Sequence, residues 1–194
     1  MTRALVLFAH PVPESFSSSL HRATVDVLKG RGWEVDDCDL YAEGFNPVLS
    51  CEERRIYHDE PANIEPVAEH VERLQAAEAL VMVFPVWNFG YPAMLKGYLD
   101  RVFLPGVSFG MRDGKVGGCL HNIRKVAAVT HYGTTQLRAA VLGDPPRRSV
   151  TRHIRAVVHP RAKMRYLALY DMNRADAARR EHFMARVTRQ MESF

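Results

Sequence analysis

Two short runs of apolar residues constrain the fold of this 194-residue chain more than any other feature. ALVLF (Ala4 to Phe8) and ALVMVF (Ala79 to Phe84) lack the alternating polar residues of a strand with one face in water. Such runs are typical of strands buried on both faces, as in parallel sheets covered by helices on each side. They therefore predict the centre of an α/β sheet.

Weaker strand signals and helical repeats alternate along the rest of the chain. We expect strands at WEVDDCDL (Trp33 to Leu40), KVAAVT (Lys125 to Thr130) and RYLALY (Arg165 to Tyr170). Apolar residues at helical spacing predict helices around Leu20 to Leu28, Ile64 to Leu74, Tyr91 to Phe103 and, with Asn173 as N-cap, Phe183 to Met191. This alternation favours parallel strands joined by right-handed crossovers. We predict one domain, residues 1–194, with a doubly wound five-stranded sheet in the flavodoxin-like order 2-1-3-4-5 rather than a Rossmann order.

Two segments fall outside this pattern. Gly44 to Asn63 reads as a long irregular excursion, and loops of that length are usually functional or form interfaces. SVTRHIRAVVHP (Ser149 to Pro160) could be a helix, although prolines and arginines surround it.

The cysteines and the charge distribution indicate which metal, membrane or nucleic-acid partners to expect. Cys38, Cys51 and Cys119 form no CxxC and have no histidine at metal-ligand spacing, so we expect free thiols and no metal site. The apolar run before His10 is too short for a signal peptide or a membrane span, which predicts a cytoplasmic protein. Net charge is +4, with the basic excess between Asp144 and Gln190. No interleaved aromatic residues accompany it, so we interpret it as a solvated face and expect no nucleic-acid partner.

Three loops follow strands and should meet at the carboxyl edge of the sheet, where open α/β sheets bind ligands. They are AHPVPESFSSS (Ala9 to Ser19), PVWNFG (Pro85 to Gly90) and THYGTT (Thr130 to Thr135). The first places four serines where a helix begins, which suits a phosphate, although one of them could serve only as an N-cap. GxGxxG and GxxxxGK[ST] are both absent from the sequence.

The other two loops suit a planar ring. Trp87 and Phe89 offer flat apolar faces beside the amide of Asn88, but they could equally pack against the sheet edge or a second subunit. His131 and Tyr132 could close over a polar ring edge. A phosphate site, a ring site and a polar edge together describe a site for flavin mononucleotide.

The composite of these motifs resembles a known family. The matching pieces are LVLFAHP and SFS within Leu5 to Ser17, GWEVDDCDLYAEGFNPVLS (Gly32 to Ser50), FPVWNFGYPAMLKGYLDRVF (Phe84 to Phe103) and AVTHYG (Ala128 to Gly133). They resemble the flavodoxin-like NAD(P)H:quinone oxidoreductases, which include DT-diaphorase-type enzymes, azoreductases and ancillary subunits of potassium efflux systems. The WNF triplet is closer to the YNF of azoreductases than to the QWF of mammalian-type quinone reductases.

The resemblance implies which residues hold a flavin. The phosphate or ribityl positions are matched by His10, Ser15, Phe16, Ser17 and Ser19, the isoalloxazine positions by Pro85, Val86, Trp87, Asn88, Phe89 and Gly90, and the pyrimidine-edge positions by Thr130, His131, Tyr132 and Gly133. The third loop departs from the family's Thr-Thr-Gly-Gly or Ser-Arg-Gly-Gly run, and Arg138 falls near an expected tyrosine. The chain is shorter than the FAD-binding members, which favours FMN over FAD.

The resemblance also implies a reaction. A hydride would pass from NAD(P)H through the flavin to a quinone or similar acceptor by a ping-pong mechanism, with His131 and Arg138 as candidate catalytic residues. It implies a homodimer as well, with Gly44 to Asn63 as a possible source of subunit contacts. Alternatives are an electron carrier, a flavin-binding regulatory subunit, or an α/β domain without flavin. The donor (NADH or NADPH) and the acceptor stay open.

Overall fold

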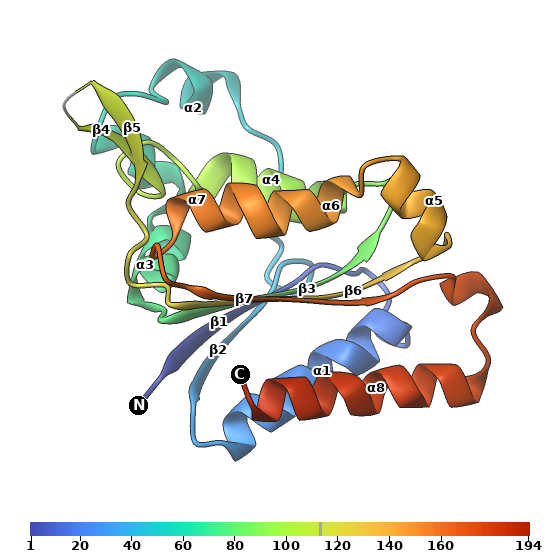
Figure 1. The fold of residues 1–194 in the computed structure, drawn as a ribbon. Helices are drawn as coiled ribbons and strands as arrows, with labels where there is room; N and C mark the ends of the chain where they lie inside the picture. The colour runs from blue at the N-terminus through green and yellow to red at the C-terminus, as the bar shows by residue number, and fades with distance from the viewer. Residues whose placement is uncertain (113) are drawn as a thin grey trace.

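A five-stranded parallel sheet lies at the centre of the computed structural model, which describes residues 1–112 and 114–194 (Figure 1). Its strands run in the order β2-β1-β3-β6-β7. Their bounds are Arg3–Phe8 (β1), Glu34–Asp39 (β2), Ala79–Val86 (β3), Lys125–Tyr132 (β6) and Lys163–Leu169 (β7). This confirms the predicted fold and strand order, because β6 and β7 are the fourth and fifth predicted strands. A separate antiparallel hairpin, β4 (Phe109–Arg112) and β5 (Lys115–Gly118), was not predicted.

Helices cover both faces of the sheet. On one face α1 (Phe16–Gly30) and α8 (Ala177–Glu192) lie side by side; on the other lie α3 (Ala68–Ala76), α4 (Ala93–Val102) and α7 (Arg155–Val157) (Figure 1). Side chains of β1 alternate between the two cores: Leu5 and Leu7 enter one, Val6 and Phe8 the other. Two-sided burial is the reason that β3, and β1 from Ala4 onward, are apolar.

Helices α1 and α8 each begin after a residue whose side chain caps the first turn. Ser15 caps α1, and its Oγ accepts a hydrogen bond from the Ser18 amide at 3.1 Å. The predicted N-cap Asn173 is wrong: the short 3-10 segment η3 (Met172–Arg174) comes first, and Asp176 caps α8 by accepting from the Arg179 amide at 2.8 Å. Asp176 has the extended backbone of an N-cap residue, which leaves its carboxylate free to reach that amide.

The segment Gly44 to Asn63 is partly ordered as helix, and the prediction that it is irregular is wrong for α2 (Cys51–Arg55). Ser50 and Glu53 form a capping box at its start. The segment then packs on α4, where Arg101 donates to the Glu53 carboxylate at 2.5 and 2.8 Å. The 3-10 helix η1 (Ala62–Val67) leads from it into α3.

The segment SVTRHIRAVVHP, whose structure the sequence left open, is mostly helical. After α5 (Gln136–Val141), the chain continues through α6 (Pro145–Arg148), the π-helical segment η2 (Ser149–Ile154) and α7 without a break. The prolines 145 and 146 occupy its first turn, where the missing amide hydrogens cost nothing. Val150 and Ile154 enter the core beneath it.

Some of the basic excess protects an exposed sheet edge. Strand β7 has a neighbour on one side only. Arg186 donates to the carbonyl of residue 168 in β7 at 2.9 Å, and Arg155 and Arg179 donate at 3.1 and 2.8 Å to the carbonyls of residues 162 and 170, which flank the strand. Charged side chains on an edge oppose pairing with another strand. Among the described residues, no helix combines the length and the apolar character needed to cross a bilayer.

Candidate functional site

The three predicted loops converge at the carboxyl edge of the sheet. The parallel register pairs Phe8 with Val83, and Phe84 with Thr130, so the strands β1, β3 and β6 end at one level. The connections leaving β1 and β3 turn to helices on opposite faces, α1 and α4 (Figure 1). This is the topological switch point at which open α/β sheets hold ligands.

The first loop is built around hydroxyl groups that hold its backbone. Ser15 Oγ accepts from the Ser18 amide, and Ser18 Oγ donates to the Val12 carbonyl at 2.9 Å. The amides of Phe16 and Ser17 stand at the first two helical positions, where the helix supplies no acceptor. They lie at the positive end of a 15-residue helix, which suits an anion such as phosphate. Ser18, which is absent from the predicted binding residues, is one of the residues that shape this end.

One hydrogen bond joins the first loop to the third. Ser17 is fully buried, and its Oγ lies 2.9 Å from Nε2 of His131. The ring of Phe16 lies 5.9 Å from the His131 ring. Burial, and to a lesser extent the nearby His10, lower the pKa of His131 to about 4. His131 is therefore neutral at pH 7 and can form hydrogen bonds there without carrying positive charge.

The second loop forms a tight turn with an unusual backbone. The Gly90 amide donates to the Trp87 carbonyl at 2.8 Å and the Trp87 amide to the Gly90 carbonyl at 3.3 Å. Asn88 and Phe89 between them have φ angles of +48° and +57°, the signature of a type I′ turn. This conformation is rare for a bulky residue and costs on the order of 1 to 3 kcal/mol, and such strain often occurs at functional sites. Trp87 is 42% exposed at this turn, with the His10 ring 5.7 Å away.

Behind the second loop, Pro85 is buried and Val86 is half-buried, so both anchor the turn to the sheet. Helix α4 begins immediately after it, with Pro92 at the N-cap. The turn is thus held between a central strand and a helix that contributes Leu95 and Tyr98 to the core.

The third loop turns its two flanking side chains in opposite directions. His131 faces Ser17, whereas the Tyr132 hydroxyl lies 2.6 Å from the Asp144 carboxylate and 2.5 Å from the Tyr166 hydroxyl. Tyr170 also donates to Asp144, at 2.9 Å. The Tyr132 side chain is 1% exposed in this cluster, so it reaches a ligand at the loop only through its backbone. Asp144, which sequence reasoning missed, has a left-handed backbone just before two prolines.

The remaining predicted residues are spread more widely. Thr130 is fully buried, and within the described part of the chain its hydroxyl has no partner. Gly133 and Arg138 line a separate open cleft of about 490 Å³, and Arg138 is exposed on α5. Ser19 lies one turn into α1, where its hydroxyl is 3.4 Å from the Arg22 guanidinium. No hydrogen bond connects Arg138 to His131 among the described residues, so the structure does not join the two predicted catalytic residues.

The donors at this edge fit a flavin nucleotide. Free amides at the start of α1 match a phosphate, and the exposed Trp87 beside the half-buried His10 matches an aromatic ring system. Backbone groups of the strained turn and of the third loop supply polar contacts for a ring edge. Adjacent loops therefore offer one site suited to a phosphate and one suited to a planar ring.

Comparison with known proteins gives three findings. A family model described as flavodoxin-like fold matches residues 2–191. The NAD(P)H dehydrogenase [quinone] 1 of Rattus norvegicus is 32% identical over 149 residues, which are 68% of this chain and 54% of the rat protein. An NAD(P)H:quinone oxidoreductase from Methanothermobacter marburgensis is 27% identical, covers 98% of both chains and superposes with a TM-score of 0.84.

A further solved structure is an FMN-dependent NADH-azoreductase from Bacillus anthracis in complex with FMN. It covers 100% of this chain and 97% of its own, with a TM-score of 0.76 and 15% identity, and so establishes a shared fold only. This chain spans about half the length of several curated relatives that it matches, with 54% of the rat protein and 56% of NAD(P)H dehydrogenase [quinone] 1 of Cavia porcellus covered.

Proposed function

Because this chain belongs to the flavodoxin-like fold family, we propose that it is a flavin-dependent NAD(P)H oxidoreductase whose second substrate is a quinone or a similar acceptor. The observation that carries the proposal is the meeting of the α1 amino end, the exposed Trp87 turn and His131 at one sheet edge. The relatives whose names state such an activity support the reaction class.

Each loop has a defined task in this proposal. The amides of Phe16 and Ser17 bind the phosphate of the cofactor, and Ser17 holds His131 in place through their hydrogen bond. The turn at Trp87 to Gly90 would hold the ring of the cofactor. A bound flavin supplies hydride acceptance from NAD(P)H and two-electron transfer to the acceptor. The neutral His131 orients polar groups at the ring edge and excludes water there, rather than supplying a cation.

Finer features belong to the proposal as well. We propose FMN rather than FAD, a ping-pong order of substrates, one domain, and a cytoplasmic location that suits three free thiols. A homodimer is supported by α5, beside the third loop, where Leu137 and Val141 are 77% and 78% exposed. Light scattering of the purified chain measures its mass in solution, and a monomer at working concentration would refute the dimer.

A visible spectrum of the purified protein tests the central proposal. We expect flavin absorbance, or its recovery after adding FMN or FAD, and bleaching on anaerobic addition of NADH or NADPH. Reoxidation by a soluble quinone completes the cycle. Colourless protein that binds neither flavin would overturn the proposal, and bound flavin that neither donor bleaches would indicate a carrier or a regulatory subunit.

A matched pair of variants locates the site. Trp87→Ala removes an exposed indole, so stability should change little while FMN binds about three- to tenfold more weakly, the loss expected for one aromatic contact. Met111→Ala removes a 75% exposed side chain from the β4–β5 hairpin and should leave FMN affinity unchanged. Equal affinities in the two variants would place the cofactor elsewhere.

A further inference from the structure

A buried thiol, a carboxylate and an imidazole meet beside strand β2, away from the residues assigned to the flavin. One ligand atom each from Cys38, Glu43 and His70 lies within 4.8 Å of the other two. Cys38 belongs to β2, Glu43 to the loop that follows, and His70 to α3. Thiolate, carboxylate and imidazole are the three ligand types that proteins use for Zn²⁺.

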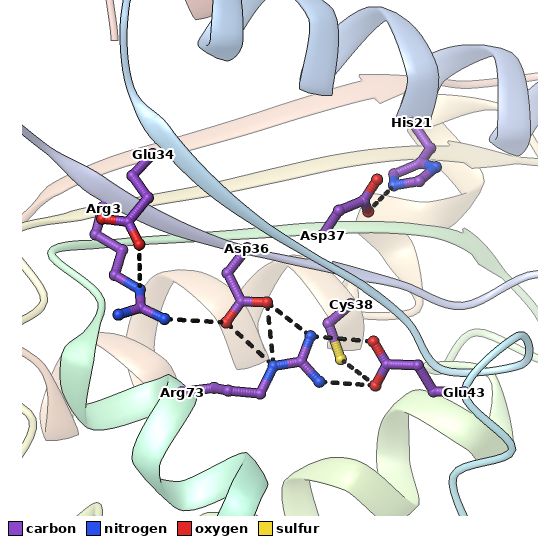
Figure 2. Close-up of polar contacts among 8 residues, drawn as sticks. All are labelled: Arg3, His21, Glu34, Asp36, Asp37, Cys38, Glu43 and Arg73. Atoms are coloured by element: carbon purple, nitrogen blue, oxygen red, sulfur yellow. Dashed lines mark hydrogen bonds and ion pairs between the residues drawn. The ribbon is translucent and has the colours of Figure 1, made fainter.

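Neighbouring side chains hold two of the three groups in position. Arg73 donates to both carboxylate oxygens of Glu43, at 2.7 and 3.0 Å, and to Asp36 on its other side (Figure 2). The Cys38 thiol points at the same Glu43 carboxylate, with Sγ 3.4 Å from Oε2 (Figure 2). Carboxylates that bind metals are commonly held by hydrogen bonds from neighbouring side chains, as Arg73 holds Glu43.

The third group is an imidazole with an unused nitrogen. The His70 ring packs edge-on against Phe45 and Tyr98, at centroid distances of 4.9 and 5.5 Å. Its Nδ1 is buried and has no hydrogen-bond partner among the described residues. A buried ring nitrogen without such a partner is available to bind a metal ion.

The local charge favours a cation despite Arg73. An open cleft of about 710 Å³ gives access to Glu43 and His70 from solvent. Its charged lining comprises Arg3, Arg73, Glu34, Asp36, Glu43 and Glu69, two positive groups against four negative ones. A net negative cleft in a chain of net charge +4 is a local departure from the overall charge. With a thiolate and a divalent ion added, the charges of Cys38, Glu43, Asp36, Arg73 and the ion sum to zero.

We propose that Cys38, Glu43 and His70 bind Zn²⁺, with solvent completing the coordination. The ion replaces the thiol proton, which leaves to solvent, so that a sulfur–metal bond forms as the S–H bond breaks. The site joins β2 to α3 across an edge of the sheet. It is independent of the flavin proposal, since none of its ligands lies on the three flavin loops.

The test uses the whole 194-residue chain, untagged and treated with chelator, with Co²⁺ as a spectroscopic substitute for Zn²⁺. We expect one Co²⁺ per chain with thiolate-to-metal charge-transfer absorbance, which Zn²⁺ then removes by competition. Zn²⁺ at about 100 times its dissociation constant should raise the Tm by about 5 to 10 °C. Absence of thiolate absorbance in the wild type would overturn the proposal.

Variants assign the ligands. Cys38→Ser should abolish the thiolate absorbance, whereas Cys51→Ser, which changes an exposed cysteine outside the cluster, should retain it. His70→Gln should weaken Zn²⁺ binding at least tenfold, and it tests the site even if Cys38→Ser does not fold. Circular dichroism and flavin content report folding separately. Absorbance that persists in Cys38→Ser, or unchanged affinity in His70→Gln, would refute the assignment.

Discussion

Replacing His131 by glutamine tests whether this histidine is neutral in the folded protein. The pKa of His131 is lowered from 6.5 to about 4, mainly by burial. Between these two values the unfolded chain binds a proton that the folded chain does not, so stability rises with pH. The contribution is fully present above pH 6.5 and is lost as the pH falls toward 4. Glutamine cannot titrate but retains an amide that can reach Ser17.

The linkage relation gives the size of the effect. At pH 5 an unfolded-state pKa of 6.5 and a folded-state pKa of about 4 correspond to about 2 kcal/mol of lost stability, and at pH 7 to about 0.2 kcal/mol. Taking the flavin-free protein from pH 7 to pH 5 should therefore destabilise the wild type by about 2 kcal/mol more than it destabilises His131→Gln. Any pH-independent cost of the substitution cancels in this difference.

Urea unfolding at pH 7, 6 and 5, followed by circular dichroism, measures the difference. Exposed His58→Gln serves as the control for the change from imidazole to amide and should follow the wild type at all three pH values. Parallel pH profiles for the wild type and His131→Gln would refute the reasoning. His131 would then be as easily protonated in the fold as in the unfolded chain, and a cationic role at the edge of the proposed flavin would again be open.

Two further predictions concern the packing of α4 against the segment that carries α2. Gly97→Ala should gain about 1 kcal/mol of helix propensity but lose more, because the new Cβ would collide with the Pro47 carbonyl oxygen. Urea unfolding should show a net loss of about 1 to 3 kcal/mol. Gly30→Ala, whose new Cβ meets no atom within 4 Å, should be neutral or stabilising. A Gly97→Ala protein as stable as the wild type would contradict this packing. Arg101→Ala leaves the Glu53 carboxylate, 14% exposed, without its ion pair and should cost about 3 to 5 kcal/mol by thermal or urea unfolding, whereas Lys96→Ala, in an exposed pair on the same helix, should cost under about 1 kcal/mol. Similar losses in these two variants would show that burial does not distinguish the pairs.

Most of the architecture was predictable because its causes are local or periodic. The apolar runs of β1 and β3 require burial on both faces, and the helical repeats between strands require crossovers, so few topologies remain. The two errors in helix placement, at Asn173 and in Gly44 to Asn63, arise because tertiary packing selects between local alternatives. Asparagine and aspartate are both good N-caps, so the sequence does not show which of them begins α8. The five-residue helix α2 is too short to show a hydrophobic period in the sequence.

In the candidate site, too, some features follow from the sequence and others do not. The sequence by itself determined which loops reach the carboxyl edge, because strand order and parallel direction follow from the pattern of strands and helices. It could not determine which of His131 and Tyr132 points toward which side of the sheet. Neighbouring residues at a strand end face opposite sides, and the hydrogen-bond partners that fix their directions, Ser17 for His131 and Asp144 for Tyr132, lie elsewhere in the sequence.

Only the tertiary structure decided the remaining features. The positive φ angle of Phe89 is imposed by a turn that β3 and α4 hold from both ends, against the local preference of a bulky residue. The grouping of Cys38, Glu43 and His70 has no sequence spacing that signals a metal site, because β2, its loop and α3 bring the three together only when the sheet edge is folded.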